Sequence, residues 1–211
     1  MANSFVTAAK KVLKTEADAL GKLKDDLPSD FSDLVKLILN LTGRVIVSGV
    51  GKSGHIGNKI AATLASTGTP AYFVHATEAS HGDLGMITEQ DLCLLISNSG
   101  ETIEMFDILT HARRFSIPIA TMSSNCESTL VKAANFKLCL PMADEACPIG
   151  MAPTTSTTMM LALGDALAVA LMEAKSFNAE NFKVFHPGGK LGAKLMTVSQ
   201  LMHKDDAIPL V

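Results

Sequence analysis

The sequence RVIVSGVGKSGHIG, residues 44–57, has the pattern of a short apolar strand that leads through a glycine-rich turn into a helix. Glycines let the backbone turn sharply and let a ligand approach it closely. The start of the following helix offers unpaired N–H groups and the positive end of a dipole, which together favour an anion, most often phosphate. Lys52 adds a positive charge and Ser53 a hydroxyl. This stretch therefore predicts an anion site at a strand-to-helix turn.

The rest of the chain repeats the alternation of strand and helix. Apolar strand-like runs recur at residues 45–48, 71–74, 92–97, 117–121 and 136–140, and helical stretches at residues 53–66, 102–115 and 127–134 separate most of them. Alternation of this kind predicts a parallel sheet with helices on both faces. We expect an α/β fold with a parallel five-stranded sheet, in the three-layer arrangement of Rossmann-like and flavodoxin-like folds.

Helical patterns flank this alternating region. Residues 5–23 have an apolar and a charged face, and a second helix is expected from about residue 30 to residue 41. Neither helix is needed to build a parallel sheet, so both could pack against another subunit. A long helix at residues 154–175 and a shorter one at residues 179–185 precede a final loop, HPGGKLG.

The composition limits the class of protein. A chain of 211 residues that is 47% hydrophobic suits one packed domain, and a net charge of −3 is too small to indicate nucleic acid or an anionic membrane as partner. The four cysteines, Cys93, Cys126, Cys139 and Cys147, form no CxxC pair, so we expect unpaired thiols in a reducing compartment. The N-terminus lacks a signal-peptide core, and the apolar run at residues 159–172 is too short to span a bilayer. We therefore expect a soluble intracellular protein.

The glycine-rich turn has two nucleotide-binding interpretations, and both are disfavoured. Residues 49–54, GVGKSG, match the GxGxxG fingerprint of dinucleotide-binding folds, which also needs an acidic residue at the end of the second strand. That strand is followed by His75, and the first acidic residue is Glu78. The Walker A pattern would need glycine at position 46, where the chain has Ile46.

A second polar loop, SNSGET at residues 97–102, also lies between a buried strand and a helix start. Ser97, Ser99 and Thr102 supply hydroxyls that suit anionic oxygens, although the loop could instead serve only as a helix cap. The carboxyl ends of parallel strands line a common crevice, so two such loops favour one shared site. A neutral, hydroxyl-rich site of this kind suits a sugar phosphate.

Several ionisable side chains could move protons at such a site: Lys52, Glu104, Glu145, His75, His81 and His186. Glu104 falls in the first turn after the hydroxyl-bearing loop, where a carboxylate also favours the helix dipole. Glu145 lies in a loop, and His186 precedes Pro187 and two glycines, where it could equally be a surface residue. Two carboxylates and a histidine near a phosphate site are what proton transfer next to a carbonyl requires.

Four longer motifs, at residues 49–88, 96–102, 144–171 and 186–192, closely resemble the arabinose-5-phosphate isomerases, which have the sugar-isomerase (SIS) fold. The resemblance extends from about residue 44 to the C-terminus and is looser in the N-terminal helices. It implies N-terminal helices at residues 1–42, an SIS domain at residues 43–196, and a linker at residues 197–211. Full-length members resembling this chain continue into a pair of cystathionine-β-synthase (CBS) domains, which this sequence does not include.

The resemblance also implies a function. Members interconvert D-ribulose 5-phosphate and D-arabinose 5-phosphate through an enediol, the first step in making 3-deoxy-D-manno-octulosonate (Kdo) for lipopolysaccharide or capsule. It implies a cytoplasmic bacterial homotetramer that acts on a phosphorylated pentose and requires no cofactor, with zinc as a possible inhibitor bound at His75. A regulatory sugar-phosphate-binding SIS module and an isomerase for another phosphosugar remain as alternatives.

Site residues follow from the resemblance where the motifs match. The catalytic positions are Lys52, Glu104, Glu145 and His186, and the sugar contacts are Gly68, Thr69, His75 and His81. The phosphate would bind Ser97, Ser99 and Thr102, with Ser53 nearby. We expect Glu104 to remove the carbon-bound proton and His186 to serve the sugar oxygens, although these two roles could be exchanged. Lys52 would stabilise the enediolate, and Glu145 would orient the sugar or share the proton traffic.

Overall fold

The computed structural model describes residues 2–186. At its centre is a five-stranded sheet in the order β2-β1-β3-β4-β5, in which every pairing is parallel. The strands are β1 (Val45–Gly49), β2 (Ala71–Phe73), β3 (Leu92–Ile96), β4 (Ile119–Ser123) and β5 (Phe136–Cys139). The order reverses at β1, because β2 lies on one side of it and β3 on the other. The parallel five-stranded sheet confirms the predicted α/β class. In open sheets of this class, ligands bind at the carboxyl ends of the strands where the order reverses.

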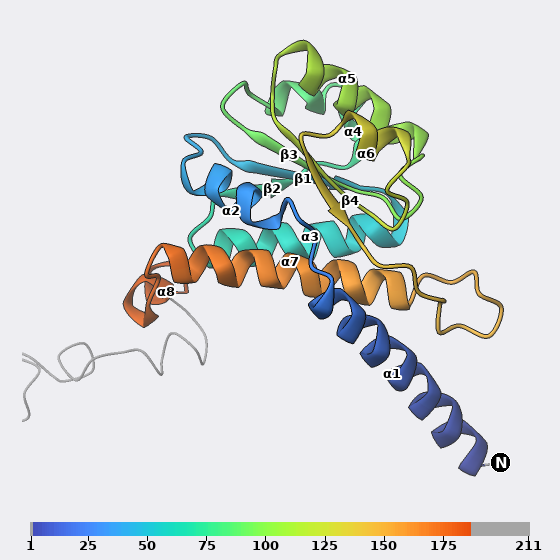
Figure 1. Cartoon of the computed structure of the whole chain (residues 1–211). Helices are drawn as coiled ribbons and strands as arrows, with labels where there is room; N and C mark the ends of the chain where they lie inside the picture. The colour runs from blue at the N-terminus through green and yellow to red at the C-terminus, as the bar shows by residue number, and fades with distance from the viewer. Residues whose placement is uncertain (1, 187–211) are drawn as a thin grey trace, which may run out of the picture.

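Helices cover both faces of this sheet, as Figure 1 shows. They are α1 (Ala2–Asp25), α2 (Phe31–Leu39), α3 (Gly51–Ser66), α4 (Ala76–Ala79), α5 (Phe106–Arg114), α6 (Thr129–Ala133), α7 (Thr155–Ala174) and α8 (Ala179–Phe185), with 3-10 turns at Asp83–Met86 and Ile103–Met105. The helix expected from residue 102 thus begins as a 3-10 turn and becomes α-helical at Phe106. The N-terminal part of α1 projects away from the body of the molecule (Figure 1).

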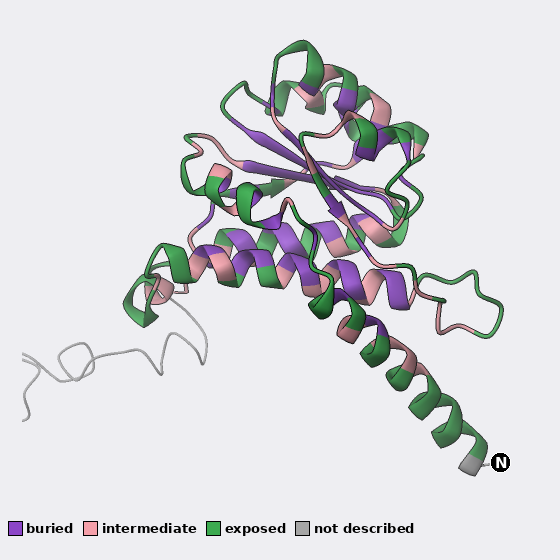
Figure 2. Ribbon diagram, in the orientation of Figure 1, coloured by how far each residue is buried: buried purple, intermediate pink, exposed green. Residues whose placement is uncertain are grey.

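Two hydrophobic cores lie on either side of the sheet. Successive side chains of a strand point to opposite faces, so Val45 and Val47 join the core with α3 and α7, while Ile46 joins the core with α5. Strands β1, β3 and β4 are buried along their whole length (Figure 2). The apolar run at residues 92–96 is therefore the buried central strand that its composition predicts.

Helices α3 and α7 pack side by side and run in the same direction. Ser53 Oγ lies 3.9 Å from Met160 Sδ near the start of both helices, and Lys59 forms an ion pair with Asp165 further along. The two contacts join residues at nearly the same separation in sequence, 107 and 106, so the two helices are parallel. The N-termini of both helices therefore reach the carboxyl edge of the sheet.

Helix α7 extends beyond the apolar run at residues 159–172 and, with 20 residues, is long and apolar enough to cross a membrane by length and composition alone. Half of it is buried inside the protein, where it packs against α3. This is the environment of a core helix in a globular domain.

The cysteines depart from the prediction of unpaired thiols. Cys126 and Cys139 form a disulfide with a Cα–Cα distance of 5.6 Å, whereas Cys93 and Cys147 are free. Cys139 ends β5 and Cys126 follows the neighbouring strand β4, so the two meet across adjacent strand ends. Their spacing in sequence does not reveal this neighbourhood, because it depends on strand order.

Candidate active site

The two predicted loops lie next to each other. Gly49 at the end of β1 pairs with Ile96 at the end of β3. The glycine loop after β1 (residues 49–54) and the hydroxyl loop after β3 (residues 97–102) therefore leave the sheet from adjacent strands, at the same edge. The prediction that the two loops lie at the same edge of the sheet is confirmed.

The glycine loop brings backbone amides to that edge. Helix α3 begins at Gly51, which has a φ of +58° that favours glycine, and no side chain caps the helix. A Cβ on Gly54 would lie 2.8 Å from the carbonyl oxygen of Gly49, so glycine is also needed for strand and helix to approach this closely. The uncapped first turn offers N–H groups to an anion.

The hydroxyl loop is held in shape by its own side chains. Ser97 Oγ and Thr102 Oγ1 lie 2.7 Å apart, and the Gly100 amide donates to Ser97 Oγ at 3.0 Å. The Glu101 amide donates to Ser99 Oγ at 3.2 Å. Ser97 is buried and Ser99 is exposed. Ser97 thus supports the loop from within, while Ser99 is open to a ligand.

A third loop braces the hydroxyl loop, and its residues were missed by the sequence analysis. Ser123 Oγ donates to the Asn98 carbonyl at 3.0 Å, and Ser124 Oγ donates to Asn98 Oδ1 at 2.8 Å. On the other side, the Thr129 amide donates to Glu101 Oε1 at 2.8 Å. The available signal was that Ser123 and Ser124 stand at the end of an apolar strand, just as the serines of the hydroxyl loop do.

Glu145 is clamped onto the start of α7. Its Oε2 accepts hydrogen bonds from the Thr154 amide at 2.7 Å and the Thr154 hydroxyl at 3.0 Å, and its Oε1 accepts one from the Ser156 hydroxyl. Burial alone would raise the pKa of Glu145, but the hydrogen bonds from Ser156 and Thr154 outweigh it and lower that pKa below its ordinary value. Glu145 is therefore an ionised carboxylate with both oxygens already engaged.

Unlike the side chain of Glu145, those of Glu104 and Lys52 are exposed and have no partner among the described residues. Glu104 lies in the 3-10 turn that follows the hydroxyl loop, and Lys52 lies in the first turn of α3. Both are exposed, and neither has a side-chain hydrogen bond or ion pair within residues 2–186. Of the two predicted carboxylates, Glu104 is the one free to exchange a proton with a ligand.

His75 and His81, the two predicted histidines that follow β2, differ in their hydrogen bonds. His75 follows β2 and caps α4, because its Nδ1 accepts the Thr77 amide at 3.3 Å. The neutral His75 ring must then carry its proton on Nε2. His81 is exposed between α4 and the turn Asp83–Met86. Within residues 2–186 no group of three or more His, Cys, Asp or Glu side chains could hold a metal ion, so the described residues gather no such set around His75.

The remaining predicted residues lie at the other edge of the sheet. Gly68 and Thr69 precede β2, and both bind the Lys175 ammonium, which donates to the Gly68 carbonyl at 2.9 Å and to Thr69 Oγ1 at 2.8 Å. His186 directly follows α8, and its ring stacks on Phe182 with a centroid distance of 3.7 Å. The HPGGKLG motif beyond His186, the end of the predicted domain at residue 196 and the predicted linker lie outside the described residues.

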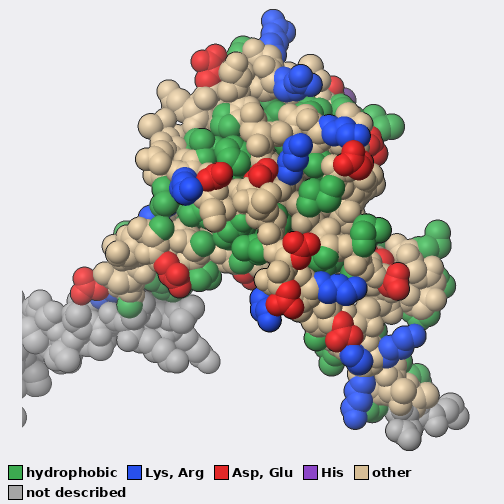
Figure 3. Space-filling model, viewed as in Figure 1, with side chains coloured by type: hydrophobic (Ala, Val, Ile, Leu, Met, Phe, Trp, Pro, Cys, Tyr) green, Lys and Arg blue, Asp and Glu red, His purple; other side chains and the backbone are tan. Residues whose placement is uncertain are grey.

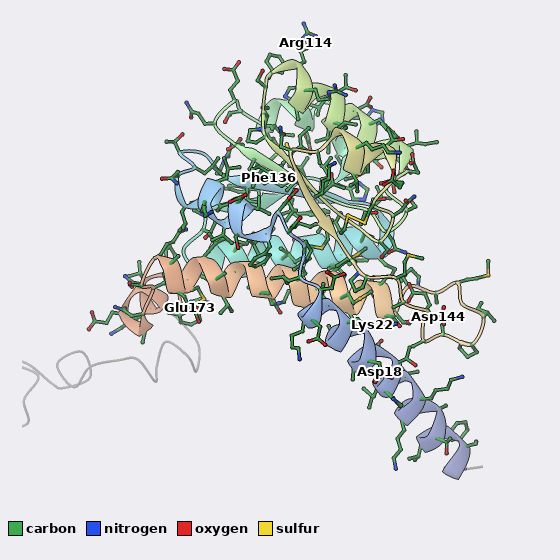
Figure 4. The ribbon with its side chains drawn as sticks, in the orientation of Figure 1. Asp18, Lys22, Arg114, Phe136, Asp144 and Glu173 are labelled. Carbon is green, nitrogen blue, oxygen red and sulfur yellow. A yellow bond between two sulfur atoms is a disulfide. The ribbon has the colours of Figure 1, made fainter. Side chains whose placement is uncertain are left out.

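A full helix separates the two groups of predicted residues. Helix α7 has 20 residues and is therefore about 30 Å long. Figure 4 shows Asp144 near its first turn and Glu173 near its last. Glu145 lies at the first of these ends, and Gly68, Thr69 and His186 lie at the second. One chain alone therefore does not bring all four predicted catalytic residues together.

The charge distribution does not create a second anion site on the visible face. Figure 3 shows Lys and Arg interspersed with Asp and Glu, without a patch of one sign. A phosphate at this face would therefore meet no concentrated positive charge.

Comparison with known proteins shows what the chain is similar to. A family model described as SIS domain matches residues 38–170. The Arabinose 5-phosphate isomerase KdsD of Yersinia pestis is 54% identical over 98% of this chain and 63% of that protein, and the protein of the same name from Pseudomonas aeruginosa is 50% identical over 98% and 64%. The chain thus spans less than two thirds of the length of these relatives.

Solved structures agree with this similarity. The Escherichia coli CFT073 protein c3406, solved in complex with arabinose 5-phosphate, has a TM-score of 0.85 and 39% identity over 88% of this chain and 98% of that one. A putative phosphosugar isomerase involved in capsule formation from Bacteroides fragilis has a TM-score of 0.82 and 36% identity over the same shares.

Proposed function

The chain belongs to the SIS-domain family, and from that premise we propose that it interconverts D-ribulose 5-phosphate and D-arabinose 5-phosphate. The names of the relatives and the ligand of the c3406 structure support this substrate pair. The observation that carries the proposal is the unpaired Glu104 carboxylate directly beyond the hydroxyl loop, next to an uncapped helix start that bears Lys52.

The reaction moves one proton between neighbouring carbons. With the phosphate on the hydroxyl loop, the open-chain sugar is held with C1 and C2 near Glu104. Glu104 removes the proton from C2 of arabinose 5-phosphate, the electron pair shifts to the C1 carbonyl oxygen, and an enediolate forms. Return of this proton to C1, together with transfer of the O2 proton to O1 by His186, gives the ketone at C2 and the hydroxyl at C1 of ribulose 5-phosphate. Lys52 stabilises the oxyanion of the intermediate.

The other groups assist this transfer. Glu145, which is ionised and fully engaged, serves to position the start of α7 rather than to carry the proton. His186 serves ring opening and the sugar oxygens. Because the proton transfer is internally balanced, the proposal includes no cofactor, and it treats zinc at His75 as an inhibitor.

We place the catalytic unit in a homotetramer. Within one chain, His186, Gly68 and Thr69 lie at the end of α7 opposite to Glu145, so a second copy would have to bring these residues to the first copy's loops. Large apolar side chains on α1 support subunit contact, because Phe5 is 72% and Leu13 is 66% exposed. The proposal also places the enzyme in the bacterial cytoplasm, at the first step of Kdo synthesis.

A substrate panel tests the function. The chelator-treated protein is given arabinose 5-phosphate, with ribose 5-phosphate and sedoheptulose 7-phosphate as controls, and ribulose 5-phosphate is measured by a coupled assay. The proposal expects product from arabinose 5-phosphate alone. Tight binding without turnover would indicate a regulatory module, and turnover of another phosphosugar alone would indicate a different isomerase.

A further inference from the structure

A cavity of about 290 Å³ lies beside the glycine loop, on the side away from the hydroxyl loop. It is lined by Gly51, Gly54, His55, Asn58, Phe73 and His75. Its size is close to the lower end of the range for small-molecule sites, about 300 Å³. Apart from His75, none of its side chains is among the predicted site residues.

Helix α3 contributes two free polar side chains to this cavity. His55 and Asn58 are three residues apart on α3, so they share one face of the helix. Both are exposed, and within the described part of the chain neither side chain has a hydrogen-bond partner. Their hydrogen-bonding groups are available to a ligand in the cavity.

The β2 side contributes an apolar surface and a donor. The Phe73 ring packs against the glycine face of α3, where a Cβ on Gly57 would lie 3.1 Å from it. Phe73 also meets His75 edge to face at a centroid distance of 6.3 Å. Since Nδ1 of His75 accepts the Thr77 amide, Nε2 of the neutral ring is the donor that remains for a ligand. Apolar and polar surfaces together suit a sugar, which has C–H faces and hydroxyls.

The cavity is within reach of a ligand held at the hydroxyl loop. The hydroxyl loop follows β3 and His75 follows β2, with β1 between them. Neighbouring strands lie about 4.8 Å apart, so the two positions are separated by about 10 Å along the sheet edge. The start of α3, with Lys52, lies between them.

We propose that this cavity binds the hydroxyl-bearing end of the phosphosugar, with His55 and Asn58 as the residues that recognise its hydroxyls and select among pentose phosphates. This inference rests on the proposed function, because it assumes that the phosphate occupies the hydroxyl loop. The amide of Asn58 can donate to one hydroxyl and accept from another, so it can distinguish sugars that differ in the configuration of a single carbon.

The test uses His55→Ala and Asn58→Ala, with Asn40→Ala as a matched control at an exposed position on α2's C-terminal end. We expect each cavity variant to raise KM for arabinose 5-phosphate about tenfold, because one or two hydrogen bonds are lost. We also expect a smaller ratio of the Kd for ribose 5-phosphate to the Kd for arabinose 5-phosphate, since the hydroxyl contacts that distinguish the two sugars are removed. The Kd for inorganic phosphate and the Tm should equal those of the wild type, since the hydroxyl loop is untouched.

Two results would overturn the inference. One is that both cavity variants keep the wild-type KM for arabinose 5-phosphate and the wild-type ratio of the Kd values for ribose 5-phosphate and arabinose 5-phosphate. The other is a Kd for inorganic phosphate that weakens in parallel with KM, which would indicate a structural effect on the neighbouring loop. If the wild type fails to turn over arabinose 5-phosphate, the proposed function fails instead. The cavity is then judged by whether the two variants weaken binding of that sugar phosphate more than binding of inorganic phosphate.

Discussion

The Thr154 amide donates a hydrogen bond to Glu145 Oε2 over 2.7 Å, so a carboxylate from the preceding loop caps helix α7. Helix starts are commonly capped by the residue directly before them. Here the cap comes from nine residues earlier, and Ser156 engages the other oxygen. The consequence is a division of labour between the two candidate carboxylates, with Glu145 held ionised and Glu104 left free.

Ser156→Ala should raise the pKa of Glu145 above its wild-type value, because a hydrogen bond to the charged form is lost. Glu145 would then become protonated, and would release the start of α7, at a higher pH than in the wild type. The loss of kcat/KM as the pH falls would therefore begin at a higher pH. The acid limb of the profile of kcat/KM against pH measures this shift. Thr157→Ala, which removes a hydroxyl bonded only to the Pro153 and Thr154 carbonyls, is the control. An unchanged acid limb in Ser156→Ala would contradict the prediction.

Glu145→Gln should destabilise the fold in a pH-dependent way. The pKa of Glu145 is lower in the folded state than in the unfolded state. The stability that ionised Glu145 contributes is therefore fully present above its unfolded-state pKa, and it is lost as the pH falls through its folded-state pKa. We expect a loss of about 0.5–2 kcal/mol in the free energy of unfolding at pH 7, the range for a lost helix cap. Urea titrations at pH 7 and about pH 3 check this, and an equal deficit at both pH values would count against it.

Gly100→Ala should damage the hydroxyl loop. Gly100 has a φ of +66°, and a Cβ there would overlap the Ser128 hydroxyl. We expect a loss of about 1–3 kcal/mol in stability and weaker binding of phosphate. Gly21→Ala is the matched control, because Gly21 lies inside α1 with nothing within 4 Å, and it should stabilise by about 0.5–1 kcal/mol. Wild-type phosphate binding in Gly100→Ala would refute the proposed loop geometry.

Mixing two inactive variants tests whether the site is shared between subunits. If His186 acts on the site of another copy, Glu104→Gln and His186→Asn subunits should regain activity when they are unfolded and refolded together. Each variant refolded alone provides the control, and the stoichiometry is read by light scattering. Activity that stays at the level of the separate variants would place Glu104 and His186 in the same subunit or exclude His186 from catalysis.

The part of the fold that follows from local pattern could be predicted. The apolar runs around Val45 and Leu92 became β1 and β3, and the polar residues directly after each of them lie at one sheet edge because parallel strands place them there. Three features could not be predicted from pattern: the Glu145–Ser156 clamp, the Cys126–Cys139 disulfide and the position of His186. Each depends on how segments distant along the chain meet in space, which neither periodicity nor motif spacing specifies.

The central claim is that Glu104 transfers the proton in a phosphosugar isomerisation, and one comparison tests it most directly. Conversion of arabinose 5-phosphate by the wild type and by Glu104→Gln is followed by NMR, with the Kd of the sugar measured on the same samples. We expect ribulose 5-phosphate from the wild type and a kcat lower by about 10²–10⁴ in the variant, the usual contribution of a general base, with little change in Kd. Wild-type turnover by Glu104→Gln would contradict the assignment of the base, and a wild type that binds the sugar without forming ribulose 5-phosphate would contradict the function.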